Sequence, residues 1–371
     1  MKTLRRLIYG EVMAKVGFAT MGFVGLFFFF DLVDELKWIG QGPGNAYSVR
    51  HALAYVLLLV PGHVYELMPI TVLIGTIFVM ARFAQSSEFT ILRTSGLGPF
   101  KALHTLLGLG LGFVVLTFVV GDYVTPLASR QAQLIKARYL GEAGSQGITG
   151  AWLKESHGKT SSVVNVTALG GEGQLIGVRV FEFDASGKLT GMIRAGMGEV
   201  LADGNVWLLK NVQHDHFQAT ASNGRPQIKR EQLPEWRWEN SLSEEMVSVA
   251  LLKPERMATV ELFNYIQHLR SNDQASQRYE IDFWKKVFYP LSCLVMVVLA
   301  LPFAYLHLRS NSMTSMVFLG VLLGISFFLI NNLFGFIGNL NAWSPWLAAA
   351  TPGLVYMAAS LLAFGWLVLR H

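Results

Sequence analysis

The chain is poor in cysteine: Cys293 is the single one among 371 residues. Without a second cysteine no disulfide can form within the chain, so any part outside a membrane has to be held together by its own core or by partners. Cys293 lies in an apolar stretch, and nothing around it argues for redox chemistry.

Charged residues are also scarce, at 15% of the chain, whereas hydrophobic residues make up 52% and the mean hydropathy is +0.40. This balance is typical of a protein that crosses a membrane several times and carries a soluble part. Over residues 125–280 basic and acidic residues are equal in number, so this part has no broad basic face. Nucleic acid is therefore not an expected partner.

Signatures of catalysis and of nucleotide binding are missing as well. The sequence contains no HExxH or GxSxG motif and no pair of carboxylates in an apolar run that would suggest an intramembrane aspartyl protease. The stretch GGEGQLIG at 170–177 lacks the Lys and Ser/Thr with which a phosphate loop holds phosphates and magnesium. We expect neither an enzyme nor a cofactor site, and any ATP has to be hydrolysed in another chain.

Two histidines in QHDHF are the best metal candidates. His214 and His216 are two residues apart, so on a strand both would face the same side and could share a metal ion. A third ligand with convincing spacing does not accompany them. A solvated strand face is therefore preferred over a metal site.

The chain does have long apolar runs, and six of them reach the roughly 20 residues that a helix needs to cross a bilayer. We predict spans at residues 12–33, 60–81, 102–124, 284–306, 313–333 and 346–368. The first run ends without a small-residue cleavage site, so we interpret it as an uncleaved span and not as a signal peptide. Basic residues gather in the segments that lie inside if the N-terminus is inside, which predicts that both termini are cytoplasmic.

This topology puts residues 125–283 on the outer, periplasmic face. The segments SSVVNVTAL, LIGVRVFEFD, GMIRAGMGEVL and VWLLKNVQHDHF alternate in polarity between turn sequences, which predicts antiparallel strands of a sandwich or an open roll. Residues 257–272 return to helical spacing. The predicted fold class is membrane α-helical, with six transmembrane helices and an inserted all-β, jelly-roll-like periplasmic domain; the domains are 1–124, 125–283 and 284–371.

The segment between the second and third spans, RFAQSSEFTILRTSG, is too polar for hydrocarbon. Serines 86 and 87 can cap a helix, Glu88 then suits the first turn, and Phe89 and Leu92 fall near one side, so a short helix over about 84–96 is predicted. It is either a hairpin turn in the headgroup region or a docking helix for a soluble partner. The physics of the segment does not separate these two.

Five segments together carry a family resemblance. They are VDELKWIGQG at 33–42, LMPITVLIG at 67–75, RFAQSSEFTILRTSG at 82–96, GDYVTPLA at 121–128 and FWKKVFYPLSCLVMVVLALPF at 283–303. In this order they resemble the LptF/LptG family, the permease subunits of the lipopolysaccharide exporter, an ABC transporter of the Gram-negative inner membrane. The likeness covers essentially the whole chain, and the first segment looks closer to the LptG branch than to the LptF branch.

The resemblance implies that the polar helix is the coupling helix, which sits in a groove of an LptB-like ATPase dimer, with Glu88 at the family's glutamate and Arg93 further along. It implies a heterodimer with an LptF-like permease, an LptC-like single-span protein, an LptA-like periplasmic bridge, and lipopolysaccharide as the substrate. ATP and Mg would be bound by the ATPase and no cofactor by this chain. The alternative is a membrane scaffold or sensor that transports nothing and docks partners through its β domain.

Such a lipid carries phosphates, so its path needs cations at headgroup depth. The topology favours Lys37, Arg130, Lys136 and Arg138 as lipopolysaccharide-binding residues. Lys37 could instead only pair with Asp34, and the other three could be the solvated face of a helix.

The acyl chains need an apolar wall, and the resemblance suggests a lateral gate that involves the first and fifth spans. The aromatic residues predicted to line it are Phe27, Phe30, Phe327 and Phe328. Aromatic runs of this kind are more often ordinary lipid-facing or packing surface.

Overall fold

The computed structural model describes residues 2–42, 46–86, 98–140, 150–157, 160–170, 174–201, 206–218, 227–252, 254–305 and 313–370. The chain forms two compact units. The helical unit is drawn from Met1–Phe30, Val60–Thr125 and Gln277–His371, and the β unit from Asp31–Leu59 and Pro126–Ser276.

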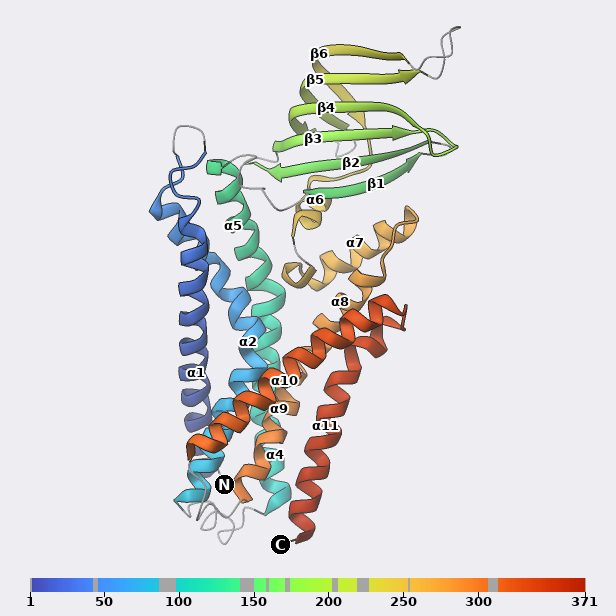
Figure 1. Ribbon diagram of the computed structural model, residues 1–371. Coiled ribbons are helices and arrows are strands. Elements are labelled where there is room, and N and C mark those ends of the chain that lie inside the picture. Colours follow the sequence, from blue (N-terminus) through green and yellow to red (C-terminus); the bar gives the residue numbers. More distant parts are fainter. Residues whose placement is uncertain are drawn as a thin grey trace. The chain divides into compact units, whose positions relative to one another are not determined.

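The membrane helices account for most of the helical unit and extend into the β unit (Figure 1). They are α1 (Lys2–Leu36), α2 (Val49–Gln85), α4 (Pro99–Val119), α5 (Thr125–Leu140), α8 (Gln277–Phe288), α9 (Ser292–Ala300), α10 (Met313–Leu340) and α11 (Pro345–Arg370). In the described residues five helical segments are long and apolar enough to cross a membrane, and the bent pair Gln277–Phe288 and Ser292–Tyr305 adds a sixth if it is one span. The predicted class, a helical membrane protein with an inserted β domain, is confirmed.

The fourth span differs from the single straight helix that its hydropathy suggests. Its two parts meet at an angle of 48°. Pro290 lies in the turn between them, and proline has no N–H to donate and clashes with the preceding helical turn. The bend therefore has a local cause in the sequence.

The first and third spans continue as helices beyond their apolar runs. The helix of the first span reaches Leu36, and the third span continues from α4 through a π-helical turn, η2 (Val120–Val124), into α5. Leucine, alanine, arginine, lysine and glutamine, which are common in α5, are good helix formers even where they are polar. Hydropathy marks where a helix is apolar and not where it ends.

Burial differs strongly between the first two spans. The most apolar part of α2 is 83% buried within the protein, whereas that of α1 is 6% buried. On α1 the buried side chains of Ile8, Val12 and Val16 form one stripe at helical spacing, while Phe18 and Met21 are exposed. Figure 1 shows both chain termini at one end of the helical unit, together with the end of α2 and the start of α4.

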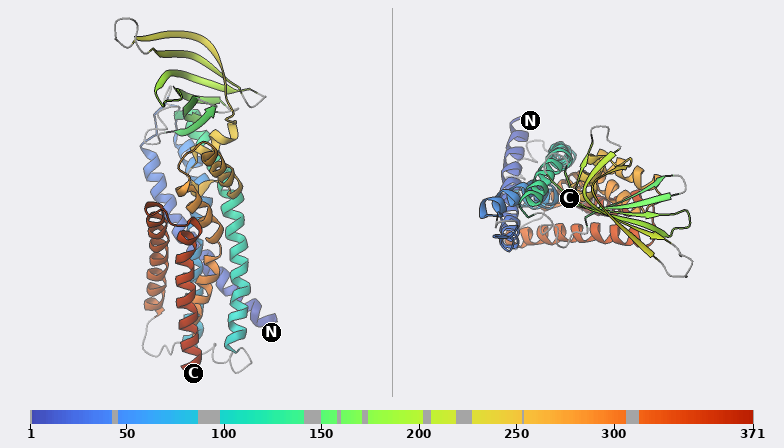
Figure 2. Two further views of the ribbon diagram at one scale, coloured as in Figure 1. Left: turned by 90° about the vertical axis from the view of Figure 1, so that its right-hand side faces the viewer. Right: turned by 90° about the horizontal axis from the view of Figure 1, so that it is seen from above.

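The β unit contains one six-stranded antiparallel sheet whose strands neighbour each other in sequence order. The strands are β1 (Ala151–His157), β2 (Thr160–Leu169), β3 (Gln174–Phe183), β4 (Leu189–Val200), β5 (Val206–Gln218) and β6 (Gln227–Glu239). The four predicted strands are confirmed, and the consecutive order fits the open roll better than the sandwich. Figure 2 shows the sheet twisted, with its strands fanned out.

The two strands that the sequence did not indicate, β1 and β6, lie at the edges of the sheet. Strand β6 is rich in charged residues and contains Pro234, which an edge strand tolerates because one side of its backbone needs no ladder partner. Neither strand has the clean alternation on which the prediction relied.

One face of the sheet forms the core of the β unit. Val164, Val180 and Ile193 lie opposite one another on β2, β3 and β4, and all three are fully buried. Trp207 is also buried, and its indole N–H donates to the carbonyl of Leu242 at 2.9 Å. Two helices follow the sheet, α6 (Glu244–Leu251) and α7 (Thr259–Ser271), and α7 confirms the helix predicted over 257–272.

Candidate functional site

The predicted basic residues lead to a buried ionic site in the β unit, which we name the Glu35 cluster: Glu35, Tyr47 and Lys136 with the rings of Trp38 and Tyr55. The ammonium of Lys136 on α5 lies 3.0 Å from one carboxylate oxygen of Glu35 near the end of α1. The hydroxyl of Tyr47 donates to the other oxygen at 2.7 Å. Glu35 is buried, with 5% of its side chain exposed.

Aromatic rings complete the surroundings of the Lys136 ammonium. It lies 4.2 Å from the centroid of the Tyr55 ring and 5.6 Å from that of the Trp38 ring. A cation above an aromatic face is attracted by the negative charge of that face. One carboxylate and two rings therefore compensate this charge within the protein.

The hydroxyl of Tyr47 is the hydrogen-bond donor to Glu35 in the cluster. Burial, together with its hydrogen bond to the Glu35 carboxylate, raises the pKa of Tyr47 above its ordinary value. The phenol therefore stays neutral and keeps its hydrogen bond to the Glu35 carboxylate, which also pairs with Lys136. These contacts make the cluster a tie between α1 and α5.

The loop after α1 is held close to α5 by a glycine. Gly42 has φ +91°, and a Cβ there would lie 2.1 Å from the carbonyl oxygen of Tyr139. Tyr139 in turn stacks on His51 at a ring-centroid distance of 3.8 Å. Only glycine combines this backbone conformation with so close an approach.

Arg130 is engaged in a second ion pair of the β unit. Its guanidinium pairs with the carboxylate of Glu261 at the start of α7, and 29% of the arginine side chain remains exposed. The other oxygen of Glu261 accepts the backbone N–H of Ala258 at 3.1 Å. The arginine is thus bound to a carboxylate that also caps a helix.

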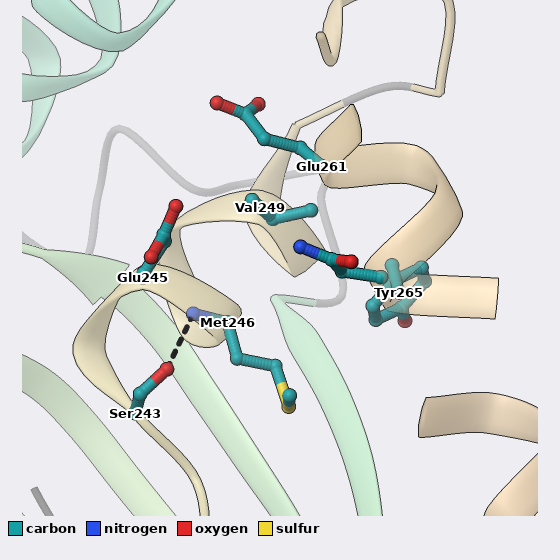
Figure 3. Close-up of a pocket in the computed structure, with 7 residues that line it drawn as sticks. Ser243, Glu245, Met246, Val249, Glu261 and Tyr265 are labelled. Carbon is teal, nitrogen blue, oxygen red and sulfur yellow. Dashed lines mark hydrogen bonds between the residues drawn. The ribbon is translucent and has the colours of Figure 1, made fainter. Parts of the chain in front are cut away.

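Beside this pair lies a small cavity between α6 and α7, of about 110 Å³. Figure 3 shows it between Ser243 and Val249 on one side and Glu261 and Tyr265 on the other. Pockets that enclose a small organic ligand usually measure about 300 Å³ or more. The cavity has room for a few water molecules and not for a lipid.

Lys37 and Arg138 are more accessible. Lys37 has 62% of its side chain exposed and approaches the carboxylate of Asp34 only at 4.0 Å, while Arg138 is exposed on α5. The ammonium of Lys37 lies 6.0 Å from the centroid of the Trp38 ring, the indole that Lys136 also approaches. The structure therefore brings Lys37 and Lys136 to one aromatic residue, and Arg138 keeps an accessible charge.

The four phenylalanines predicted to form a wall differ in position. Phe327 is buried, 2% exposed, and its ring lies edge-on to that of Tyr356 in the core of the helical unit, so its position does not support a lining role. Its neighbour Phe328 points outward and is 42% exposed. On α1, Phe30 is 57% exposed, and Phe27 is 38% exposed and stacks on His63.

The predicted coupling residues Glu88, Phe89, Leu92 and Arg93 lie outside the described residues. The segments on either side of them are described. Arg82 pairs with Glu11 at 3.0 Å near the end of α2, and Pro99 is the first residue of α4, a position that suits proline. Their part in coupling stays a prediction.

The two histidines considered for metal binding are close to each other on β5. Their ring centroids are 3.7 Å apart, and His214 is buried with one ring nitrogen 3.5 Å from a Glu182 oxygen. Over the part of the chain that the structure describes, no group of three or more His, Cys, Asp or Glu side chains is arranged to hold a metal ion. The structure offers the pair no metal centre there.

The carboxylates that neutralise two of the predicted cations were not found from the sequence. Glu35 and Glu261 lie far from Lys136 and Arg130 along the chain, and neither stands in a motif that indicates its partner. A weak local signal existed for Glu35, since a charged residue directly after an apolar run has to face water or a cation.

Comparisons with known proteins agree in one family. The family model described as lipopolysaccharide export system permease LptF/LptG matches residues 6–369. The lipopolysaccharide export system permease protein LptG of Escherichia coli K12 is 28% identical over 340 residues, which cover 91% of this chain and 90% of that protein. The protein of the same name from Haemophilus influenzae is 26% identical over 369 residues, covering 99% and 98%.

Proposed function

Because the chain belongs to the LptF/LptG family of lipopolysaccharide export system permeases, we propose that it is the subunit through which ATP hydrolysis in another chain drives lipopolysaccharide out of the inner membrane. The observation that carries this proposal is the family match over residues 6–369. The helices long enough to cross a membrane and the inserted β unit support it. The chain is a transport subunit and not an enzyme.

Energy input is needed because the substrate is a lipid with several acyl chains. Exposing apolar surface to water costs about 25 cal/mol per Å² unless a protein surface covers it. We propose that lipid enters a cavity between this chain and an LptF-like permease, that closure of the ATPase collapses the cavity, and that lipid passes to the periplasmic β domains. The weakly buried face of α1 supports a lipid or protein neighbour on that side.

Contact with lipid phosphates is proposed for the cations at the start of this path. Lys37 and Arg138 are exposed and can meet a phosphate directly. Lys136 already pairs with Glu35 and Arg130 with Glu261, so a phosphate that binds either cation has to share it with a carboxylate or displace that carboxylate. The four residues therefore differ in what lipid binding has to displace.

Coupling to ATP is proposed for the segment that contains Glu88 and Arg93, between α2 and α4. The helix ends on either side of it lie at the same end of the helical unit as both termini (Figure 1), which supports a common cytoplasmic side. An LptB-like ATPase dimer would hold ATP and Mg and dock there. An LptC-like single-span protein and an LptA-like bridge are the further partners that we propose.

Charge reversal at the coupling segment tests this function. In vesicles that contain this chain, its permease partner, the ATPase and lipopolysaccharide, Glu88→Lys is expected to abolish ATP-dependent lipid release. Glu244→Lys, a reversal at an exposed residue of α6, serves as the matched control and should release lipid normally. Normal release with Glu88→Lys contradicts the coupling role, and no ATP-dependent release from the parental complex favours the scaffold.

A further inference from the structure

A lysine is buried in the helical unit close to the place where the fourth span breaks. Lys286 on α8 is 6% exposed and precedes Pro290, which lies in the break, by about one helical turn. A charged side chain in a membrane span is unfavourable unless its charge is satisfied, and such residues commonly serve a function. Its contacts therefore indicate what it does.

The ammonium of Lys286 reaches the irregular point of another span. It donates a hydrogen bond of 3.0 Å to the carbonyl oxygen of Gly121, which belongs to the π turn η2 of the third span. A π turn inserts one residue into a helix and disturbs the regular hydrogen-bond pattern, so its carbonyls can accept from side chains. The ammonium also lies 5.5 Å from the centroid of the Tyr65 ring on α2.

Tyr65 packs directly against the π turn. A Cβ on Gly121 would lie 2.3 Å from two carbons of the Tyr65 ring, so this contact requires glycine. The same ring lies 5.1 Å from the ring of Tyr289 in the break of the fourth span. The hydroxyl of Tyr289 donates to the backbone carbonyl of Glu66 on α2. One short part of α2 thus contacts both irregular points.

Helices bend at π turns and at prolines far more easily than elsewhere. Two such points in neighbouring spans can move independently unless a directional contact joins them. A hydrogen bond from an ammonium is stronger than one between neutral groups and depends on geometry, whereas an apolar side chain would only fill the space. The contact between Lys286 and Gly121 has the properties of such a joint.

We propose that Lys286 is a positioning residue for transport, which makes the π turn of the third span and the break of the fourth span move together through its hydrogen bond to Gly121. The inference rests on the proposed function. In this proposal Lys286 couples ATP hydrolysis to lipid release. It does not bind lipid, and the complex does not need it for assembly.

The test is the amount of lipid released per ATP hydrolysed, measured in the reconstituted complex with lipopolysaccharide. Lys286→Met keeps the length and removes the donor, and release per ATP is expected to fall about tenfold, the factor that corresponds to one hydrogen bond from a charged group. ATP hydrolysis and assembly with the partners should remain. Lys286→Arg restores a charged donor and should recover most of the release.

The neighbouring lysine is a matched control. Lys285 lies 3.7 Å from Asp282 on its own helix and near Gly335 of α10, and Lys285→Met removes the same charge without touching the π turn. It should release lipid at the parental level. An equal loss in Lys285→Met and Lys286→Met would overturn the inference, because a general effect of charge would then explain both.

Three other results would also overturn the inference. If the parental complex releases lipid and Lys286→Met releases as much per ATP, the inference is wrong and the proposed function stands. If the parental complex releases no lipid with ATP, the function fails and the inference falls with it. If Lys286→Met does not assemble and Lys286→Arg restores both assembly and release, the residue serves folding alone, which also overturns the inference.

Discussion

Two lysines, one in each unit, are enclosed in different ways. In the β unit Lys136 has a full negative charge beside it, the carboxylate of Glu35 at 3.0 Å, and two aromatic rings. In the helical unit Lys286 donates to the backbone carbonyl of Gly121 at 3.0 Å, and its ammonium lies 5.5 Å from the centroid of the Tyr65 ring. The contact of Lys136 is an ion pair between two side chains. The contact of Lys286 joins its ammonium to the backbone of the π turn η2.

The difference shows that a buried cation does not by itself identify a lipid site. Lys136 was expected to meet lipid phosphate, yet in this structure a carboxylate already occupies that role. A phosphate that replaces Glu35 would leave a buried carboxylate without its cation, which is costly. Lys37 and Arg138, which are exposed, need no such exchange.

The largest effect is expected from opening the ionic tie. Glu35→Ala leaves the ammonium of Lys136 and the hydroxyl of Tyr47 without their common acceptor, so the free energy of unfolding should fall by about 3 kcal/mol. Thermal unfolding of the purified chain in detergent measures this change.

A double variant separates the tie from simple loss of packing. Adding Lys136→Met to Glu35→Ala should recover about 1–2 kcal/mol, because residues in one ion pair are not additive. If the losses in the free energy of unfolding from the two substitutions simply add, Glu35 and Lys136 do not stabilise each other. Lys136 would then not be part of an ionic tie, and its difference from Lys286 would disappear.

A smaller effect is expected in the loop that closes over α5. Gly42→Ala should lower the free energy of unfolding by about 2 kcal/mol, because it combines a strained backbone conformation with a clash against Tyr139. Gly40→Ala is the matched control, since Gly40 also has a positive φ of +78° but open space around its Cβ position. Equal losses in both variants would show that the close approach adds nothing.

The ion pairs that the buried carboxylate of Asp215 makes with the half-exposed Arg194 and Arg230 should respond to pH. Hydrogen bonding to Arg230 lowers the pKa of Asp215 below its ordinary value. A carboxylate with a lowered pKa in the folded state stabilises above its unfolded pKa, about 4, and this stabilisation is lost as the pH falls through the folded pKa. The free energy of unfolding of Asp215→Asn should therefore change less with pH below about pH 4 than that of the parent.

Acid unfolding curves of the parent and of Asp215→Asn, followed by circular dichroism of the strands, check this prediction. The two curves should approach each other at the lowest pH, where the parental carboxyl is protonated as well. Parallel curves over the whole acid range would show that the carboxylate makes no ionic contribution.

The smallest effect on stability is expected at Lys37. Its ion pair with Asp34 is long and exposed, so Lys37→Gln should change the free energy of unfolding by less than about 0.5 kcal/mol. A loss comparable to that of Glu35→Ala would mean that Lys37 belongs to the structural tie and is not available to a ligand. Thermal unfolding under the same detergent conditions provides the comparison.

Local patterns in the sequence predicted most of the fold. Apolar runs located the membrane helices, and two-residue alternation located β2 to β5. The strands β1 and β6 escaped because edge strands carry charge and, in β6, Pro234. The bend of the fourth span and the π turn of the third span escaped because hydropathy records composition and not backbone geometry.

The candidate site was predictable only in part. Sequence and topology brought attention to Lys37, Lys136, Arg130 and Arg138, but not to the carboxylates that neutralise two of them, since pairing across distant segments leaves no local trace. Neighbouring residues such as Phe327 and Phe328 also look alike in sequence. Their opposite exposure depends on the packing of α10 against α11.

Photocrosslinking from position 37 shows whether lipid passes the end of α1. A photoreactive residue is placed there, and the chain is reconstituted with its permease partner, the ATPase and lipopolysaccharide. We expect a crosslink to the lipid in the absence of nucleotide, and we expect this crosslink to decrease when ATP is added. A complex that hydrolyses ATP yet never yields a lipid crosslink at this position would contradict the path for lipid past the end of α1.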